Sequence, residues 1–430
     1  MKKLTKNQFD QALRKGHGRA LMHVEEHGIG KYLPLLEQAC LTNYVYDPQI
    51  EGSRFEWLHE LIVASGKKSH FLNLIKEHLP QSTNYNDVDQ LAGIAECFAG
   101  HGDRELVDTL YENFEKFYLE FKDSALIGSE LVYIDGFEAL GFTAKIIAQN
   151  DISEKDQDIW FYKYCCMDLG KKRVDAFLSK IPECQLWHKK IKADFKDYFD
   201  HGSSISKPAP NLDEVVNWLD NAENAKRPNL LKFAKIASKA DLHFLYKRMQ
   251  KCTGTQSLWR HLQIFGSVPP PNLDNFLFIL AKSKIEYRIR MSAFTALAQI
   301  KSRRIRQFAF DIIKQDPKSI FDSAFELFRK NYMKGDSKFI EEALRTSKNP
   351  EDLHSVGLDL IALFDITDDK SFFNCAMWVY ENTPCSFCRF SAVGTLYDWK
   401  LLPKEIQAEC RFDSFDETRD LCKKRFQSRS

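Results

Sequence analysis

Apolar residues recur along most of the chain at intervals of three and four positions, the period of a helix with one buried face. Thr5 and Gln8 have the form of a capping box, in which two side chains satisfy backbone N–H groups at a helix start, and Ser53 and Glu56 repeat it. The apolar face expected after the second box consists of Trp57, Leu58, Leu61 and Ile62. Alternating β-branched runs joined by hairpin turns are missing from the sequence. The pattern therefore predicts an all-α protein.

A six-residue pattern that begins with serine occurs four times in the last third of the chain. The serines are Ser292, Ser323, Ser355 and Ser391, at spacings of 31, 32 and 36 residues. A helical apolar pattern repeated at this period is typical of stacked helix pairs, in which each pair buries its face against its neighbours. We therefore expect an α-solenoid, a superhelical stack of antiparallel helix pairs.

Two clusters of turn-forming residues divide the chain. Residues 201–211 combine Gly, Ser and Pro, a composition that supports neither helix nor strand, and Pro269–Pro271 precede the most regular repeats. The expected parts are an N-terminal helical region of diverged helix pairs over 1–200, a linker or long loop over 201–211, and a C-terminal repeat array over 212–430 that is most regular over 272–425.

The repeats are similar to those of the HEAT family. In one unit, residues 290–300 form a helix with a small-residue core and residues 303–313 form the second helix. Ala293 and Ala392 stand where paired helices approach closely. This resemblance, over residues 272 to 425, implies HEAT-like antiparallel helix pairs. Residues 13–54 also look like the start of bacterial HEAT-like proteins of uncharacterised function, which implies a bacterial cytoplasmic protein.

The composition and net charge limit the kinds of partner that we expect for this protein. The chain has 44% hydrophobic and 28% charged residues and a net charge of +1, so any surface for nucleic acid must be a local patch. The N-terminus lacks the apolar stretch of a signal peptide, and no run is long enough to span a membrane. Eleven cysteines are scattered without a pairing rhythm, as expected for reduced, mostly buried thiols. We expect a cytoplasmic protein with no membrane partner.

A group of basic residues stands at the predicted start of a second helix, where the helix dipole disfavours cations. The candidate binding residues are Lys301, Arg303, Arg304 and Arg306, with Arg290 of the preceding helix. Their partner is either a phosphate backbone or an acidic protein surface on the concave face, or an acid of the adjacent repeat such as Asp322 or Glu326. We favour the internal ion pairs.

One motif has the spacing of a metal site. His23, Glu26 and His27 match HxxEH, the inverted zinc-protease signature, in which two histidines hold zinc and the glutamate acts as general base. A third, acidic ligand would have to come from downstream, and Glu96 or Glu105 lies at a workable separation. We favour the alternative interpretation, a polar stretch at a helix end, and expect no metal.

A second candidate is the pair Cys385 and Cys388, with Cys375 before it and Cys410 and Cys422 after it. A zinc site usually needs a second close pair at matched spacing, and the later cysteines do not supply one. The pair is therefore interpreted as structural thiols, with a helical redox pair as the alternative.

No catalytic constellation or phosphate loop is found, so we expect a protein that is not an enzyme and uses no cofactor. The predicted function is a non-catalytic HEAT-repeat scaffold that binds a protein partner on its concave surface. The alternative is a nucleic-acid-binding HEAT protein, similar to DNA glycosylases, that uses a basic concave patch. A metalloprotease is the third possibility.

Overall fold

The computed structural model describes residues 2–150, 155–202, 208–221, 226–283, 286–346 and 353–423. Helices account for 76% of the structure, and the part of the chain that it describes contains no strand. This confirms the predicted all-α class. The chain divides into two compact units, each described by itself below: unit 1 comprises Met1–Ile205 and Pro403–Ser430, and unit 2 comprises Ser206–Leu402.

The ends of the two units differ from the expected division of the chain. The helix that approaches the predicted linker continues to Gly202, and residues 203–207 of that linker lie outside the described residues. The repeat array was expected to run to residue 430, but residues 403–430 group with unit 1. Unit 1 is therefore built from both ends of the chain.

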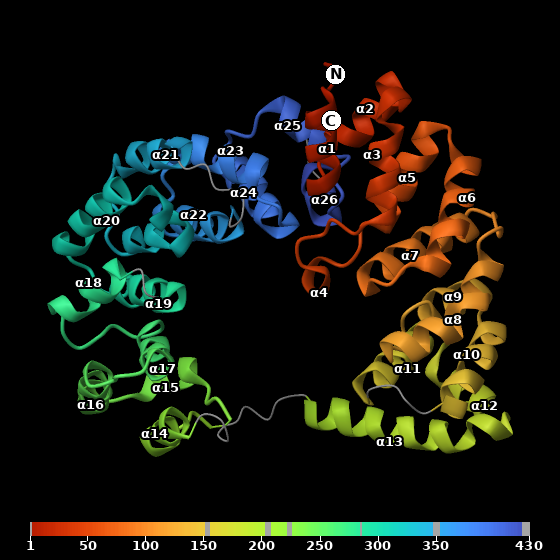
Figure 1. Ribbon diagram of the computed structural model, residues 1–430, viewed down its shortest axis with the longest axis horizontal. Helices are drawn as coiled ribbons and strands as arrows, with labels where there is room; N and C mark the ends of the chain where they lie inside the picture. The colour runs from red at the N-terminus through yellow and green to blue at the C-terminus, as the bar shows by residue number, and fades with distance from the viewer. Residues whose placement is uncertain are drawn as a thin grey trace. The chain divides into compact units, whose positions relative to one another are not determined.

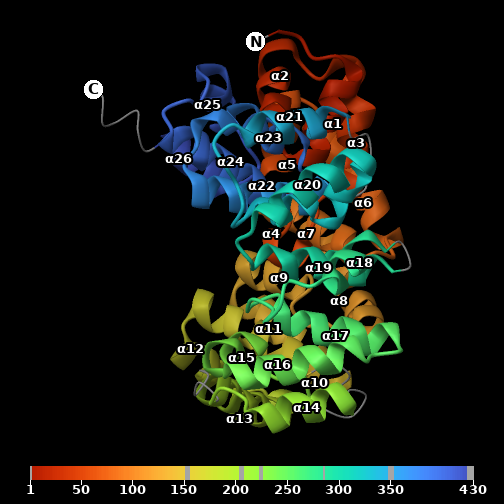
Figure 2. The same ribbon diagram turned by 90° about the vertical axis from the view of Figure 1, so that its left-hand side faces the viewer.

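Unit 1 begins with the red to yellow-green helices of Figure 1 and ends with two blue ones. The first group consists of α1 (Lys6–Lys15), α2 (Arg19–His27), η1 (Gly30–Tyr32), α3 (Leu33–Leu41), α4 (Pro48–Glu51), α5 (Phe55–Ser65), α6 (Lys68–His78), η2 (Leu79–Gln81), α7 (Tyr85–Gly100), α8 (Val107–Phe121), α9 (Gly128–Asp135), α10 (Phe137–Asn150), α11 (Lys155–Leu169), α12 (Lys171–Leu178), η3 (Pro182–Cys184) and α13 (Gln185–Gly202). The last two helices are α25 (Lys404–Cys410) and α26 (Asp416–Lys423). Figure 2 also shows α25 near α2.

Hydrogen bonds fix the C-terminal segment to the first helices of unit 1. The indole Nε1 of Trp57 donates to the carbonyl of Phe412 over 2.9 Å, and the N–H of Ser414 donates to the carbonyl of Gly16 over 2.9 Å. The backbone also approaches closely at Gly18, where an added Cβ would lie 2.1 Å from the carbonyl oxygen of Glu409. A glycine is required there because the obstacle is backbone and cannot turn aside.

The two predicted capping boxes behave differently. Thr5 and Gln8 form the expected box at the start of α1. Ser53 does not cap α5, which begins one residue later than that box requires and has no side-chain cap. The Ser53 hydroxyl instead forms a hydrogen bond with Asp89 of α7, a tertiary contact that replaces the local one. The apolar face expected on this helix is confirmed, since all four of its residues, Trp57, Leu58, Leu61 and Ile62, are buried.

Unit 2 contains the green to blue helices up to α24 (Figure 1). They are α14 (Leu212–Asp220), α15 (Leu230–Ile236), α16 (Lys239–Gln250), α17 (Thr255–Phe265), α18 (Asn275–Lys282), α19 (Tyr287–Ala298), α20 (Arg303–Gln315), η4 (Pro317–Asp322), η5 (Ala324–Phe328), α21 (Asp336–Thr346), α22 (Leu353–Thr367), η6 (Lys370–Phe372), α23 (Phe373–Asn382) and α24 (Ser386–Asp398). The break at Pro269–Pro271 falls between α17 and α18, as expected.

Three of the four serine echoes lie in α-helices and one does not. Ser292 lies in α19, Ser355 in α22 and Ser391 in α24. Ser323 has a left-handed backbone (φ 68°) between the 3-10 helices η4 and η5, and its side chain is hydrogen-bonded to the carboxyl group of Asp359. A residue in this conformation cannot continue an α-helix, so the second echo is not part of an α-helix but a 3-10 helix that begins after Ser323.

Packing supports the small residues expected in the first and last echoes. Ala293 and Ala392 are completely buried. Helix α19 packs against α17 and α18, and α24 packs against α22 and α23. The eleven cysteines are all free thiols. Among the helices of the described residues, none combines the length and the apolar character needed to cross a lipid bilayer.

Candidate functional site

Two hollows of unit 1 meet at Glu96 of α7 and Tyr133 of α9. The first, called the acidic cavity here, has a volume of about 600 Å³. Its polar and aromatic lining consists of Gln49, Tyr85, Asp89, Glu96, Asp123, Ser129, Glu130, Tyr133, Gln157, Trp160, Tyr164 and Asp168. The second, called the histidine cleft, has a volume of about 1150 Å³ and is lined by parts of α2, α5, α6, α7, α9 and the C-terminal segment.

Three helices each turn one polar and aromatic face toward the acidic cavity. The contributions are Tyr85, Asp89 and Glu96 from α7, Glu130 and Tyr133 from α9, and Trp160, Tyr164 and Asp168 from α11. Within each helix these residues are separated by three, four or seven positions, the spacings that place side chains on the same face. The local sequence therefore determines each face, and helix packing brings the three faces together.

Hydrogen bonds hold some of the carboxyl groups in place but leave others without partners. The Tyr85 hydroxyl donates to Oδ2 of Asp123 over 2.7 Å, and the N–H of Ala125 donates to Oδ1 over 2.8 Å. By contrast, the buried Oε2 atom of Glu130 and the hydroxyl of Ser129 have no hydrogen-bond partner in the described structure. Unsatisfied buried oxygens of this kind are costly, and a ligand that donates to them would remove that cost.

Burial and mutual repulsion raise the pKa values of four carboxyl groups in the acidic cavity. Burial, and then the charge of Asp89, hold the pKa of Glu130 well above its ordinary value. Burial raises the pKa of Glu96 to about 7, with smaller contributions from Glu56 and Asp168. Burial is also the main cause that raises the pKa values of Asp89 and Asp168. Among the described residues that line the cavity there is no lysine or arginine.

Aromatic rings line the accessible side of the acidic cavity. Tyr133 and Tyr164 are 62% and 41% exposed, which leaves ring surface available to a ligand. The Trp160 ring lies 6.2 Å from that of Tyr164, and the ammonium group of Lys163 lies 4.1 Å from the Trp160 ring centre. That contact shows that a cation can approach this ring. Carboxylates and aromatic faces are the groups that attract positively charged organic groups, and Glu96 has a pKa suited to proton transfer near neutral pH.

The histidine cleft adjoins this site through Glu96. The rings of His59 and His101 are stacked with their centres 4.9 Å apart, and burial, followed by the charge of His101, lowers the pKa of His59. Two basic groups of this cleft are paired with acids: Lys68 lies 2.7 Å from Asp103, and Arg419 is bonded to Glu60. The lining of this cleft thus contains basic groups, unlike the described lining of the acidic cavity.

The structure pairs two of the sequence-predicted basic residues with aspartates of unit 2. Arg290 is buried, with its Nη2 2.8 Å from Asp316 and its Nη1 3.0 Å from Asp322. Nε of Arg306 donates to Asp336 over 2.9 Å. Asp322, which the sequence suggested as an internal ion-pair partner, is thus paired with Arg290 of α19.

The other three basic residues are more accessible. Arg304 donates to the side-chain oxygen of Asn275 and lies 4.2 Å from the centre of the Phe278 ring. Lys301 and Arg303 are exposed. Their role in binding a partner stays a prediction.

The HxxEH residues are near one another: the ring centres of His23 and His27 lie 5.1 Å apart, and Nε2 of His27 lies 3.7 Å from Glu26. His23 is completely buried, its Nδ1 accepts a hydrogen bond from the N–H of Leu4 over 3.2 Å, and its ring packs against Tyr32. Within the described ranges, a single group of three histidine, cysteine or acidic ligands lies within mutual reach, and it does not include His23, Glu26 or His27. Glu96, considered as a third ligand for them, belongs to the acidic cavity.

That single group consists of His354, Cys385 and Cys388, whose ligand atoms all lie within 4.8 Å of one another. Sequence reasoning found the two cysteines but missed the histidine, because it stands 31 positions before Cys385 and only folding brings it near. Cys410 and Cys422 are hydrogen-bonded to each other in unit 1, so they do not complete this group.

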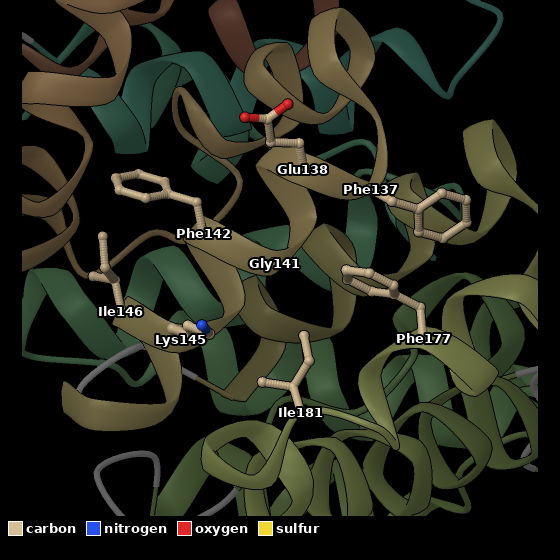
Figure 3. Close-up of a pocket in the computed structure, with 8 residues that line it drawn as sticks. All are labelled: Phe137, Glu138, Gly141, Phe142, Lys145, Ile146, Phe177 and Ile181. Carbon is tan, nitrogen blue, oxygen red and sulfur yellow. The ribbon is translucent and has the colours of Figure 1, made fainter.

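Figure 3 shows a third hollow, a groove of about 610 Å³ between α10, α12 and the following turn. Its walls are formed by aromatic and aliphatic side chains, listed as Phe137, Phe142, Ile146, Phe177 and Ile181, with Glu138 and Lys145 as the charged residues. Nothing in the structure shows what covers this groove.

Comparisons with protein-family models, with curated proteins and with solved structures find no match for this chain.

Proposed function

We propose that this chain is a non-catalytic binding protein that recognises a protein partner by taking up a lysine or arginine side chain in the acidic cavity of unit 1. The observation that supports this proposal is the set of carboxyl groups with raised pKa values that faces aromatic rings, in a cavity whose described lining includes no basic side chain.

Electrostatics favours a cation in this cavity. A positive charge about 4 Å from one carboxylate gains about 4 kcal/mol at an effective dielectric constant of about 20. Burial and neighbouring acids raise the pKa values of Glu96 and Glu130, which disfavours their ionised forms. A bound cation would stabilise their ionised forms, so binding would release protons to the solvent.

The lining favours an organic cation over a metal ion. Trp160, Tyr164 and Tyr133 offer ring faces, which attract guanidinium and ammonium groups. Among the described residues, the one group of possible metal ligands is His354, Cys385 and Cys388, and it includes none of the carboxylates of the cavity. A volume of about 600 Å³ is ample for one long basic side chain.

We further propose that the two units are diverged HEAT-like arrays and that the protein works as a scaffold. The buried Ala293 and Ala392, and the packing of α19 on α18 and of α24 on α23, support this assignment. A stack of helix pairs holds α7, α9 and α11 rigidly, which would keep the acidic cavity preorganised for its ligand. Small-angle X-ray scattering would test the scaffold: a compact, spherical particle would contradict it.

The second candidate is a nucleic-acid-binding protein similar to DNA glycosylases. One observation favours it: an acid with a pKa of about 7, Glu96, stands in a cavity with aromatic rings that can stack on a base. The lack of lysine and arginine in the described lining opposes it, because phosphates need nearby positive charge.

Isothermal titration calorimetry tests the first candidate. The probes are a lysine- and arginine-rich peptide, an acidic peptide of equal length and a short DNA duplex. We expect the basic peptide alone to bind, with proton release seen as a heat that changes with the buffer. Glu130→Gln and Glu96→Gln should each weaken binding about tenfold, the effect of about 1.4 kcal/mol.

The matched control is Glu115→Gln, which removes an exposed acid of α8 outside the cavity and should leave the affinity unchanged. Equal affinity of the cavity variants and the control would contradict the proposal. Binding of the duplex in preference to the peptide would favour the second candidate.

A further inference from the structure

Unit 2 contains a group of metal-ligating side chains that the acidic cavity and its proposed partner do not involve. His354 lies in the first turn of α22, Cys385 is the N-cap of α24 and Cys388 lies in the first turn of α24. Helices α22 and α24 pack against each other. The starts of two helices therefore bring one imidazole and two thiols together.

The distances match the geometry of a tetrahedral zinc site. Sγ of Cys388 lies 3.5 Å from Nδ1 of His354. Zinc bound to sulfur at about 2.3 Å and to nitrogen at about 2.0 Å places those two ligand atoms about 3.5 Å apart, and two sulfurs about 3.8 Å apart. All three ligand atoms lie within 4.8 Å of one another, so small side-chain movements would complete the geometry.

The surroundings favour thiolates, the form in which cysteine binds metals. The thiol of Cys385 forms hydrogen bonds with the side chains of Cys388 and His354 and with the backbone N–H of Cys388, so the three ligand groups already contact one another. Both cysteines stand at the N-terminal end of α24, where the helix dipole stabilises negative charge.

Gly357, one turn after His354 on α22, lies beside the ligands and packs closely against Thr383. A Cβ at this position would lie 3.7 Å from Sγ of Cys388 and 2.6 Å from Cγ2 of Thr383. Cys385 and Cys388 are almost completely buried, whereas His354 is half-buried. The group is thus enclosed on the cysteine side and open on the histidine side.

We propose that His354, Cys385 and Cys388 bind one zinc ion, with water in the fourth coordination position. Two thiolates and a neutral imidazole are ligands that suit zinc, and two negative charges balance the charge of the ion. Three protein ligands with a solvent-accessible fourth position are typical of exchangeable or reactive zinc rather than of a closed structural site.

Metal analysis of the full-length chain tests this site. The protein is purified under reducing conditions, stripped with a chelator, incubated with zinc chloride and desalted before elemental analysis. We expect one zinc per chain, and cobalt(II) in its place should give the near-ultraviolet absorption of thiolate-to-metal charge transfer. Cys388→Ser and His354→Ala should each weaken zinc binding by at least about tenfold.

The matched control is Cys375→Ser, which changes another buried cysteine of unit 2 that lies outside the group. Helical content measured by circular dichroism shows whether each variant folds. The proposal fails if the reduced wild-type chain binds no zinc at micromolar free metal, or if folded Cys375→Ser loses zinc as strongly as folded Cys388→Ser. A Cys385–Cys388 disulfide that re-forms while zinc is present and reductant is removed would also overturn it, in favour of a redox pair.

Discussion

The guanidinium group of Arg419 donates to both carboxylate oxygens of Glu60, over 2.8 and 2.9 Å, and so joins α26 to α5 across 359 positions of sequence. Both residues line the histidine cleft. The C-terminal segment is therefore a wall of that cleft and part of the same compact unit as the first helices.

A double-mutant cycle with Arg419→Ala and Glu60→Ala should measure this attachment. The arginine side chain is 13% exposed and that of the glutamate 41% exposed, so solvent screens the pair in part. We expect a coupling energy of about 1 kcal/mol from urea unfolding, at the upper end for partly exposed pairs. The control is the cycle for Arg345 and Glu341, in which the arginine is 72% exposed. It should give about 0.3–0.5 kcal/mol, and equal couplings would contradict the role of burial.

Gly18→Ala should destabilise unit 1 by about 1–3 kcal/mol, the usual cost of overpacking. The backbone at this position is helical, so alanine causes no conformational strain, but its Cβ would lie 2.1 Å from the carbonyl oxygen of Glu409. The matched control is Gly100→Ala at the end of α7, where no atom lies within 4 Å of the added Cβ. Thermal unfolding should show the control unchanged or more stable by about 0.5 kcal/mol. Similar losses for both substitutions would rule out the close approach as the cause.

The pH dependence of the free energy of unfolding should reveal the raised pKa of Glu96. Burial raises its pKa from an ordinary value of 4.5 to about 7, so between these values the folded state binds more protons than the unfolded state. Stability therefore falls as the pH rises from about 4.5 to about 7, and no further change from this group is expected above or below that window. The titratable and charged groups that line the two hollows with it are Glu25, Glu56, His59, Glu60, Lys68, Tyr85, Asp89, Cys97, His101, Asp123, Glu130, Tyr133, Tyr164, Asp168, Arg411 and Arg419.

Glu96→Gln removes the loss of stability that the ionisation of Glu96 causes. The urea midpoint of the variant minus that of the wild type should therefore be larger at pH 8 than at pH 4.5. The difference between the two proteins isolates Glu96 from the other groups of the site, including His59, whose lowered pKa acts in the opposite direction. Glu115→Gln, an exposed substitution on α8, serves as the control. A pH-independent difference between Glu96→Gln and the wild type would show that this carboxyl titrates as an ordinary surface group.

Arg290→Ala should destabilise unit 2 by about 3–5 kcal/mol, because it leaves Asp316 and Asp322 without their shared buried partner. Arg303→Ala, an exposed change in the same basic group, should alter stability by no more than about 0.5 kcal/mol. Urea unfolding of the two variants distinguishes these outcomes. A small effect of the Arg290 substitution would mean that its ion pairs contribute little to the fold.

Lys301→Glu with Arg303→Glu is then the suitable test of partner binding, since neither change disturbs a buried pair.

Local signals predicted the helices but not always their ends. Thr5 and Gln8 form the expected capping box, whereas Ser53, with the same local pattern, bonds to Asp89 of another helix. The echo at Ser323 shows the same limit, because a hydrogen bond to Asp359 accompanies a left-handed residue where the repeat predicts a helix. A hydroxyl has alternative partners, and only the packed structure determines which one is nearest.

The candidate sites show which groups of residues can be predicted from their spacing along the chain. Trp160, Tyr164 and Asp168 have helical spacing, so their common face was available from the sequence. That this face meets Glu96 and Glu130 depends on how α7, α9 and α11 pack. Cys385 and Cys388 were recognised by their local spacing, but His354 has no such relation to them and needed the contact between α22 and α24.

By itself, the sequence determined the helical class, the apolar faces and the position of the break before α18, because periodicity and turn formers act within a few residues of each other. Only the tertiary structure decided that residues 403–430 belong to unit 1, that Arg290 is neutralised by two aspartates, and that the raised-pKa carboxyl groups share one cavity. These features depend on which surfaces lie against each other. Burial and charge separation depend on distances in space, and those distances have no local signature along the chain.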